Sequence, residues 1–499
     1  MEVPMHTLLI YPEFPDTFWS FKHALKFARK RASSPPLGLL TVAALLPAEW
    51  PVRLIDLNVA PLTDADLAWA DMVFIGAMNV QRQSAHQIIE RCRAAGVRIV
   101  AGGPLFTGEH GQFPQVDHFV LNEAELSLPP FLTDLAAGCA GPIYRSDQFA
   151  DLTATPVPRW ELVERRRYAA MSVQFSRGCP WQCDFCNVTA LFGRKTRTKL
   201  ATQIIAELDS LYAAGWRSSI FFVDDNFIGN KQLLKNELLP RLIDWQRDKK
   251  GITFYTEVSI DLADDAELTA MMVEAGFSQV FIGIETPNEA SLGESCKRQN
   301  QQRDLVADVK RLQHAGLQVQ GGFIVGFDSD PLSIFQKQID FIQNSGIVTA
   351  MVGLLQAPHG TRLYERLKRE GRLLGEMSGD NANGLTNIVT RMNLETLLEG
   401  YRFLLERLYS PGPYYRRVMT FLREYRPPKI RAGLDFDYKI AFFQSIYRLG
   451  ILGRERVHFW KVLLWTALHR PRLIPAAITL AIYGYHFRKV SELDRQELK

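Results

Sequence analysis

Residues 172–187 read SVQFSRGCPWQCDFCN, and the interpretation of the whole fold starts from this stretch. It holds three cysteines, Cys179, Cys183 and Cys186, at the spacing C-x3-C-x2-C, directly after the strand-like run 171–175. Thiolates at this spacing on one loop can turn toward a single point, as an iron–sulfur cluster requires. Three ligands for four irons leave one iron open to bind and reduce a substrate. We therefore interpret the three cysteines as the metal ligands of a 4Fe-4S cluster.

Other roles for these cysteines fit the stretch less well. A structural zinc site usually takes four Cys or His ligands, and the nearest histidines in sequence are His118 and His314. The N-terminus, MEVPMHTLLIYPEF, has no basic region followed by an apolar run, so we expect no signal peptide and no disulfide. Buried core cysteines are an alternative, although Pro180, Trp181 and Asp184 are not typical of a core strand.

The cysteine triad, with the aromatic Phe185 just before its last member, resembles the signature of the radical S-adenosylmethionine (SAM) enzymes. The resemblance implies that SAM binds the open iron through its amino and carboxylate groups. It also implies that one electron cleaves SAM to methionine and a 5′-deoxyadenosyl radical, which abstracts hydrogen from an unactivated C–H bond. We expect a reductase, a ferredoxin or a flavodoxin to supply that electron.

Length and composition describe an ordinary globular protein. A chain of 499 residues is long enough for about two to four domains with sizeable cores. The net charge is only +4, so nothing predicts a nucleic-acid partner. The six cysteines form no disulfide framework, which suits a reducing cytosol and a cytoplasmic protein. No uncharged apolar run reaches the roughly 18 residues that suggest a transmembrane helix.

Residues 1–150 alternate short apolar runs with helical patterns. The expected strands lie at 6–11, 52–56, 72–76, 98–102 and 119–121. This alternation predicts a Rossmann-like, doubly wound parallel sheet, which binds ligands at the carboxyl ends of its strands. The candidate cofactor-binding residues there are Met78, Asn79, Gly102, Gly103, Pro104 and Glu123. No G-x-G-x-x-G follows the first strand, which argues against a dinucleotide, and a flavodoxin-like scaffold without a ligand is an alternative.

The layout of this domain resembles the cobalamin-binding domain that precedes many radical SAM domains. The matching features are Pro35-Pro36-Leu37-Gly38, Gly102-Gly103-Pro104 and Asn122-Glu123-Ala124-Glu125. The D-x-H-x-x-G motif that supplies a histidine to cobalt in other cobalamin proteins is absent. The resemblance therefore implies cobalamin bound without a histidine ligand. It does not identify the residue that faces the cobalt, and our candidates for that position are Met78 and Asn79.

Residues 171–370 repeat a strand–helix unit six times, after a Pro-containing linker at 151–170. The expected strands lie near 172–176, 219–224, 252–257, 279–284, 318–325 and 348–355. Six such units with right-handed crossovers predict a partial (β/α)6 barrel of the TIM type, open on one side. In barrels the chemistry lies at the carboxyl ends of the strands, where the cysteine loop also lies.

Polar and glycine residues end several of these expected strands. They are Asp225, Asn226, Glu257, Glu285, Gly322, Ile324 and Gly326. The Asp-Asp-Asn run at 224–226 suits either the SAM amino group or a substrate, or it is simply a helix cap. Glycines in a strand permit close approach of a flat adenine. The radical SAM resemblance carries Glu285 and the run 322–326 over as SAM contacts.

Residues 371–499 are expected to be helical after a polar break at 378–387, and to choose the substrate. Between residues 457 and 490 there is no Asp or Glu, but there are five cations: Lys461, Arg470, Arg472, Arg488 and Lys489. With the apolar runs 462–468 and 473–485, this pattern is typical of helices that lie in a membrane interface. A buried helical hairpin or a partner-binding surface is the alternative. The interface reading predicts a lipid substrate and a peripheral position on the inner membrane.

The whole chain, including its C-terminal extension, is most similar to the hopanoid C-2 methylases among the cobalamin-dependent radical SAM methylases. This resemblance implies methyltransfer from methylcobalamin to ring A of a hopanoid lipid. A methylase or cyclase acting on a tetrapyrrole, a peptide or an antibiotic precursor is an alternative. A methylthiolating enzyme should carry a second cysteine cluster, whereas the N-terminal domain holds only Cys92 and Cys139. A cobalamin-binding sensor or scaffold would leave the cysteine triad unexplained.

Overall fold

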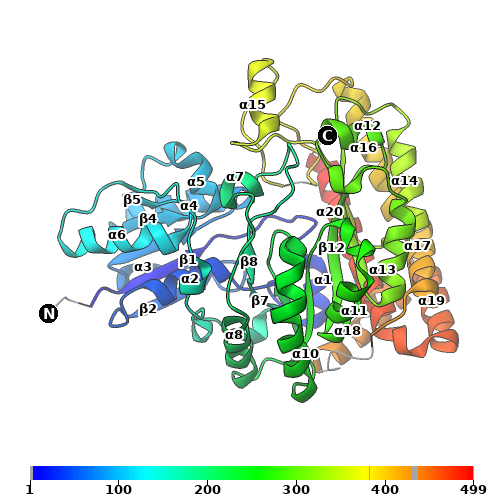
Figure 1. Cartoon of the computed structure of the whole chain (residues 1–499), viewed down its shortest axis with the longest axis horizontal. Coiled ribbons are helices and arrows are strands. Elements are labelled where there is room, and N and C mark those ends of the chain that lie inside the picture. The colour runs from blue at the N-terminus through cyan, green and yellow to red at the C-terminus, as the bar shows by residue number, and fades with distance from the viewer. Residues whose placement is uncertain (1–3, 381, 429–435, 498–499) are drawn as a thin grey trace.

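The computed structural model describes residues 4–380, 382–428 and 436–497. Two parallel sheets follow each other along the chain, and helices make up the C-terminal part (Figure 1). The first sheet, in blue and cyan, lies on the left of Figure 1, and the C-terminal helices, in orange and red, lie on the right. This architecture confirms the predicted α/β class with a Rossmann-like domain, a partial barrel and a helical extension.

The first sheet has the strand order β2-β1-β3-β4-β5-β6 and is parallel throughout. Its strands are β1 Thr7–Tyr11, β2 Val52–Asp56, β3 Met72–Gly76, β4 Arg98–Gly102, β5 His118–Val120 and β6 Ile143–Tyr144. Its helices are α2 Leu37–Leu45, α3 Asp64–Trp69, α4 Arg82–Ala94, α5 Pro104–Glu109 and α6 Ala124–Ala136. Leu8 and Ile10 pack into one core cluster and Leu9 into another, because alternate side chains of a strand point to opposite faces. Both faces of the sheet are therefore covered.

The connection between β1 and α2, residues 12–36, is long and carries the short helix α1 (Lys22–Leu25). It reaches α20 (Ile474–Glu497), at the other end of the chain. The ring of Phe18 stacks on that of Phe487 at 4.2 Å, and His486 Nε2 lies 3.0 Å from the Phe18 carbonyl oxygen. This connection thus fastens the first domain to the C-terminal helices, a role that the sequence did not predict.

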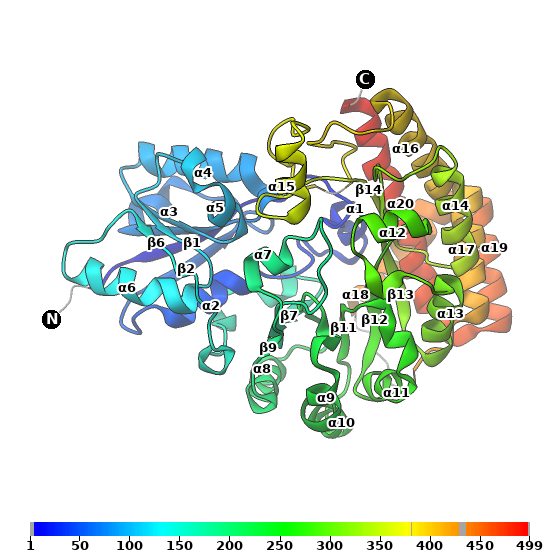
Figure 2. The same cartoon turned by 45° about the horizontal axis from the view of Figure 1, so that its top comes forward.

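The second sheet has the strand order β14-β13-β12-β11-β10-β7, again with parallel pairing. Its strands are β7 Met171–Val173, β10 Ser219–Phe222, β11 Thr253–Glu257, β12 Phe277–Glu285, β13 Gln318–Val325 and β14 Ala350–Leu354. Its helices include α8 Ala201–Ala213, α10 Leu239–Asp248, α11 Ala266–Glu274, α13 Leu305–Ala315 and α14 Ile334–Ser345. Figure 2 shows α8, α10, α11 and α13 along the outer side of this sheet. Strands β7 and β14 are its two edges, so the barrel is open, as predicted.

The shorter elements of this region surround the ends of the barrel strands. They are β8 Ser176–Arg177, α7 Val188–Phe192, β9 Arg197–Thr198, α9 Lys231–Leu233, α12 Glu289–Glu294 and α15 Arg362–Arg369. Strands β8 and β9 form a separate antiparallel pair.

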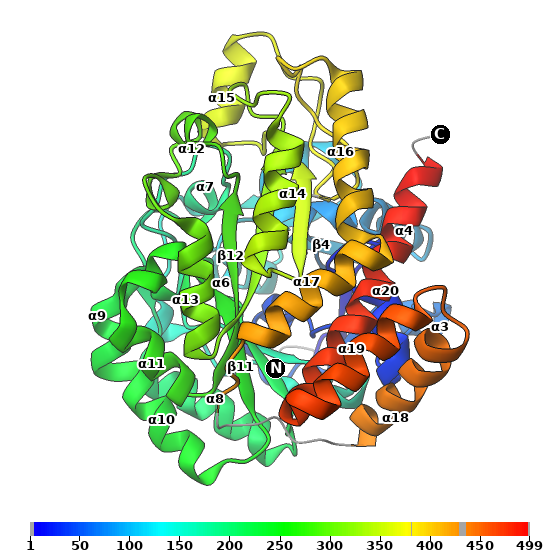
Figure 3. The same cartoon turned by 90° about the vertical axis from the view of Figure 1, so that its right-hand side faces the viewer.

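The C-terminal helices pack against the barrel and against one another (Figure 3). They are α16 Leu394–Tyr409, α17 Pro411–Glu424, α18 Phe436–Ser445 with the π-helical turn η11 Ile446–Ile451, α19 Arg456–His469 and α20. The prediction that residues 473–485 lie in a membrane interface is wrong, because α20 buries side chains on several sides: Ala477, Ile478, Leu480, Ala481 and Ile482. Such a helix is apolar nearly all round because protein covers it. Within the described ranges we find no helix with the length and apolar character needed to cross a bilayer.

Candidate active site

The loop that carries the three cysteines, residues 178–196, is closed at its base by the β8–β9 pair. Gly178 stands at the entry with φ +90°, a conformation that side chains other than hydrogen rarely allow. A Cβ atom there would lie 2.8 Å from the Lys195 carbonyl oxygen and 3.0 Å from that of Gly193. The two ends of the loop can approach this closely only because residue 178 is glycine.

The cysteine side chains lie near one another at the carboxyl end of β7, and burial raises the pKa of Cys179 and raises that of Cys186 to about 12. The Asn226 side-chain amide donates to Cys179 Sγ at 3.8 Å, and that of Gln299 donates to Cys183 Sγ at 3.6 Å. Three thiols, two of them with side-chain N–H groups aimed at their sulfurs, suit an iron–sulfur cluster.

The geometry does not match that of a single metal ion. Among the residues that the structure describes, no three or more His, Cys, Asp or Glu side chains are grouped so that they could hold one ion. A 4Fe-4S cluster takes each thiolate on a different iron, so the three sulfurs can face one cluster without lying within bonding distance of a single ion.

A buried ion pair flanks the cysteine loop. Glu285 ends β12 with φ +62° and accepts a hydrogen bond from Lys297 Nζ at 2.7 Å. Lys297 Nζ in turn lies 6.0 Å from the ring of Phe185. Burial would lower the pKa of Lys297, but the carboxylate and the neighbouring cysteines outweigh it, so this pKa is raised. The sequence predicted Glu285 and Phe185 but not Lys297 or Gln299, whose only signal is a short polar run after α12.

The end of strand β13 approaches the same place from another side. Ile324 and Phe185 pack against one apolar cluster, which brings the predicted Ile324 beside the cysteine loop. Gly326 has φ +101°, and a Cβ atom on Gly322 would come within 2.7 Å of the Phe281 ring. Packing against Phe281 therefore already explains the glycine at 322, and a SAM contact there remains a prediction.

The carboxylates after β10 hold the base of the loop. Asp224 is buried and accepts hydrogen bonds from the Phe175 backbone N–H at 3.1 Å and from the Ser176 hydroxyl at 2.5 Å. Asp225 accepts one from the Gly178 N–H at 3.1 Å. Burial raises the pKa of Asp224 to about 7 and that of Asp225 to about 6. Both aspartates thus anchor the cysteine loop to the neighbouring strand. This is a larger role than that of the helix cap, which the sequence analysis gave as the alternative.

Glu257, at the end of β11, faces the large cavity described below. Burial raises its pKa to about 8, and the charges of Asp225 and Asp224 add to the shift. Within the described chain no side chain or N–H group donates a hydrogen bond to its carboxyl group. A carboxyl group of this kind is mostly protonated at neutral pH and can donate a hydrogen bond to a bound molecule.

A cavity of about 1960 Å³ lies between the two sheets and the C-terminal helices. This volume exceeds the roughly 300–1000 Å³ of a typical small-molecule site. On the side of the first sheet it lies at the carboxyl ends of β1, β3, β4 and β5, where doubly wound sheets bind ligands. The predicted cofactor-binding residues that line it are Met78, Gly102, Gly103, Pro104 and Glu123. Asn79 does not line it, and its side chain donates to Glu109 at 3.0 Å.

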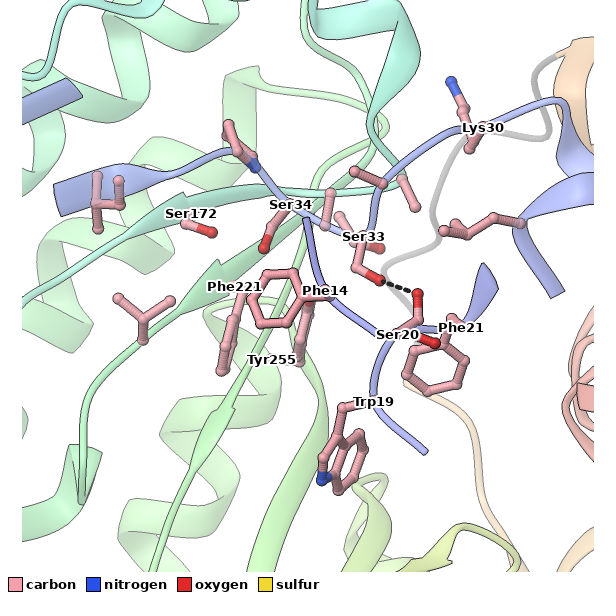
Figure 4. Close-up of a pocket in the computed structure, with 18 of the residues that line it drawn as sticks. Phe14, Trp19, Ser20, Phe21, Lys30, Ser33, Ser34, Ser172, Phe221 and Tyr255 are labelled. Atoms are coloured by element: carbon pink, nitrogen blue, oxygen red, sulfur yellow. Dashed lines mark hydrogen bonds between the residues drawn. The ribbon is translucent and has the colours of Figure 1, made fainter. Parts of the chain in front are cut away.

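Aromatic rings from distant parts of the chain line the barrel side of the cavity (Figure 4). Phe221 and Tyr255, on neighbouring strands, stack at 4.6 Å with their planes 3° apart. Trp19 and Phe21 come from the connection 12–36, and Trp19 meets the ring of Phe281 edge-on at 5.4 Å. The sequence analysis missed this connection because it has no periodic apolar pattern.

Glu123 is held in an ion-pair network between the two domains. Its side chain is 2% exposed and lies 2.8 Å from Arg197 and 3.2 Å from Arg177. It also accepts the backbone N–H of Ala150 at 2.5 Å. Glu123 therefore joins the first domain to strands β8 and β9, at the base of the cysteine loop.

Comparisons with known proteins divide the chain in the same way as the structure does, into a first domain, a barrel and a C-terminal helical part. Residues 29–132 match the B12 binding domain, residues 173–342 match the Radical SAM superfamily, and residues 361–499 match a domain of unknown function, DUF4070. A hopanoid C-2 methylase of Rhodopseudomonas palustris is 32% identical over 92% of this chain and 88% of its own length. The chain belongs to the cobalamin-dependent radical SAM methylases. An uncharacterized methyltransferase of Synechocystis sp. is 40% identical to this methylase, over 99% of the chain and 93% of its own length.

Two solved structures share the fold of this methylase. The cobalamin-dependent SAM radical enzyme OxsB, with aqua-cobalamin and SAM bound, superimposes with a TM-score of 0.61 at 14% identity, over 99% of this chain and 80% of its own. The methyltransferase TsrM from Kitasatospora setae, with cobalamin and an iron–sulfur cluster bound, gives 0.58 at 14% identity, over 98% of this chain and 100% of its own. The cofactors of this methylase are accordingly a 4Fe-4S cluster, SAM and cobalamin.

Proposed function

We propose that this methylase adds a methyl group to an unactivated carbon of a polycyclic lipid, namely carbon 2 in ring A of a hopanoid. The observation that carries the proposal is the cavity of about 1960 Å³, which is walled largely by aromatic and aliphatic side chains. It lies between the strand ends of the cobalamin-binding domain and the radical SAM barrel. The identity of 32% to a hopanoid C-2 methylase supports the same substrate class.

Residues of this chain would hold the cofactors and the substrate. When bound, the cluster and SAM supply hydrogen abstraction, and cobalamin supplies the methyl group. We propose that Cys179, Cys183 and Cys186 ligate the cluster. For SAM we propose side chains in and around the cysteine loop: Phe185, Asn226, Glu285 and Ile324. For cobalamin we propose the residues at the strand ends of the first sheet that line the cavity: Met78, Gly102, Gly103 and Pro104.

The cavity wall itself would position the lipid. The stacked pair Phe221 and Tyr255, together with Trp19 beside Phe281, offers flat apolar surfaces to a rigid ring system. Glu257 adds one polar group to this wall. Exclusion of water by these side chains would protect a substrate radical from side reactions.

The cellular setting belongs to the same proposal. We propose a cytoplasmic enzyme at the periphery of the inner membrane, where a hopanoid would be found. A reductase, a ferredoxin or a flavodoxin would deliver the electron to the cluster.

Lipid mass spectrometry tests the proposed reaction. The chain is expressed in a hopanoid-making bacterium that lacks a C-2 methylase, beside the Cys183→Ala variant. We expect a hopanoid heavier by one methylene unit with the unaltered chain only. If no new lipid forms although the purified protein contains its cluster and cobalamin, the lipid proposal is wrong, and tetrapyrroles and peptides become the substrates to test.

A further inference from the structure

Two neighbouring C-terminal segments expose apolar side chains at helical spacing. The α18–η11 segment exposes Phe443, Tyr447 and Ile451, and α19 exposes Val457, Leu464 and Leu468. Val457 is 72% exposed and Leu468 is 80% exposed, values that are high for aliphatic side chains. Residues three or four positions apart lie on one face of a helix, so each set forms a stripe. The segments pack together, and Trp460 Nε1 donates to the Gly450 carbonyl oxygen at 2.9 Å.

The exposed charges along these two segments are mostly positive. The exposed cations are Lys439, Arg448, Arg454, Arg456, Lys461 and Arg472. Between residues 438 and 491 the single carboxylate is Glu455, which is buried and paired with Arg488. Lys461 lies within the α19 stripe itself, between Val457 and Leu464. Asp437, at the start of α18, is neutralised by Lys30, whose Nζ lies 2.7 Å away. An apolar surface with several exposed cations and few carboxylates is complementary to an anionic bilayer.

The same surface borders an opening of the large cavity. The exposed residues that line the cavity fall into two groups. Gly38 and Met78 belong to the domain that binds cobalamin. The other group gathers mainly at the start of α18 and at the turn between α19 and α20: Arg31, Pro427, Lys439, Phe443, Pro471 and Arg472. Phe443, which is 68% exposed, belongs both to the α18–η11 stripe and to the cavity wall.

We infer that the face formed by α18, η11 and α19 docks on an anionic lipid bilayer, and that the lipid substrate enters the cavity from the bilayer beside Phe443. The evidence for membrane docking is the exposed apolar stripes and the charges beside them. The entry of a lipid substrate, in contrast, rests on the function proposed above. The membrane contact inferred here differs from the one predicted from the sequence, because it involves α18, η11 and α19 but not α20. The second apolar run, in α20, supports the docking face from inside, and the first run, in α19, presents one stripe outward.

Vesicle sedimentation tests the docking face. The full-length holoenzyme is mixed with vesicles of phosphatidylglycerol and phosphatidylethanolamine that contain no hopanoid, and with vesicles of phosphatidylcholine alone. We expect sedimentation with the anionic vesicles and weaker binding to the neutral ones, because each cation near an anionic surface strengthens binding about fivefold. The Lys461→Glu variant should bind the anionic vesicles several-fold more weakly.

A triple variant, Val457→Ser with Leu464→Ser and Leu468→Ser, should lose at least tenfold in binding. The control is Leu332→Ser with Leu374→Ser, which removes side chains that are 70% and 62% exposed elsewhere. Unchanged cluster absorbance shows that each variant is folded. A holoenzyme that does not sediment, or a triple variant that binds as well as the control, overturns the docking face.

The docking face and the proposed function fail separately. Methylated hopanoid produced by a chain that never sediments would overturn the docking face alone. Sedimentation by a chain that produces no methylated hopanoid would support the docking face and overturn the substrate.

Discussion

Replacing Gly178 by alanine should displace the cysteine loop, because this residue is strained and crowded at once. The added Cβ atom would lie within 3.1 Å of three backbone carbonyl oxygens, those of Lys195, Gly193 and Phe192. None of these atoms is the flexible end of a side chain, so the loop itself must move. Residue 178 would then no longer allow the start of the loop to pack closely against its end.

Gly215 offers a matched control for the magnitude. Its φ of +88° is nearly that of Gly178, at +90°, but no atom lies within 4 Å of the position its Cβ would take. Gly215→Ala should therefore cost only the left-handed backbone conformation, about 1–2 kcal/mol. Gly178→Ala should cost this amount and about 1–3 kcal/mol more for overpacking.

Anaerobic reconstitution is the assay for this pair of variants. Iron per chain and visible cluster absorbance should fall to less than about half for Gly178→Ala and should stay near wild type for Gly215→Ala. Thermal unfolding should separate the two variants by several degrees, since 1 kcal/mol corresponds to about 2–4 °C in a domain of this size. Equal iron content and equal melting temperatures in the two variants would refute the argument from crowding.

Three other predictions probe the site. Glu257→Gln should make thermal stability depend less on pH between about pH 5 and pH 9. The pKa of Glu257 is raised to about 8 in the folded protein, so its protonated carboxyl group stabilises the fold at low pH, and this contribution is lost as the pH rises through 8. A variant whose stability changes with pH as in the wild type would contradict this prediction. Glu123→Gln leaves Arg197, 2.8 Å away, without its charge partner and should destabilise the protein by about 3–5 kcal/mol, seen as a lower melting temperature. Cys183→Ala should abolish cluster absorbance while Cys296→Ala, outside the triad, should retain it; equal spectra would remove Cys183 from the ligand set.

The sequence predicted those parts of the site that depend on local spacing. The cysteine triad lies within eight residues, and each expected strand of the second sheet overlaps a strand of the structure. Glu285 stands at a strand end because the apolar run stops there. The roles assigned to these residues, and the domain boundaries at residues 150, 170 and 370, remain predictions.

Contacts between segments far apart in the chain could not be predicted from the sequence. Lys297 approaches Glu285 and Phe185 only after α12 has folded back over the strand end. Trp19 reaches the barrel because the connection 12–36 crosses from the first domain. Neither contact produces a periodic pattern in the sequence, because each is made by a single side chain of a loop.

The sequence by itself determined the two parallel sheets and the chemistry of the cysteine loop, because apolar periodicity and cysteine spacing are local properties of a chain. The tertiary structure alone decided which apolar helix is core and which faces outward. The run in α20 is buried because α1, α16, α17 and α19 surround it, whereas α19 leaves Val457, Leu464 and Leu468 uncovered. Both runs are similarly apolar in sequence, and only the neighbours that each helix acquires on folding distinguish them.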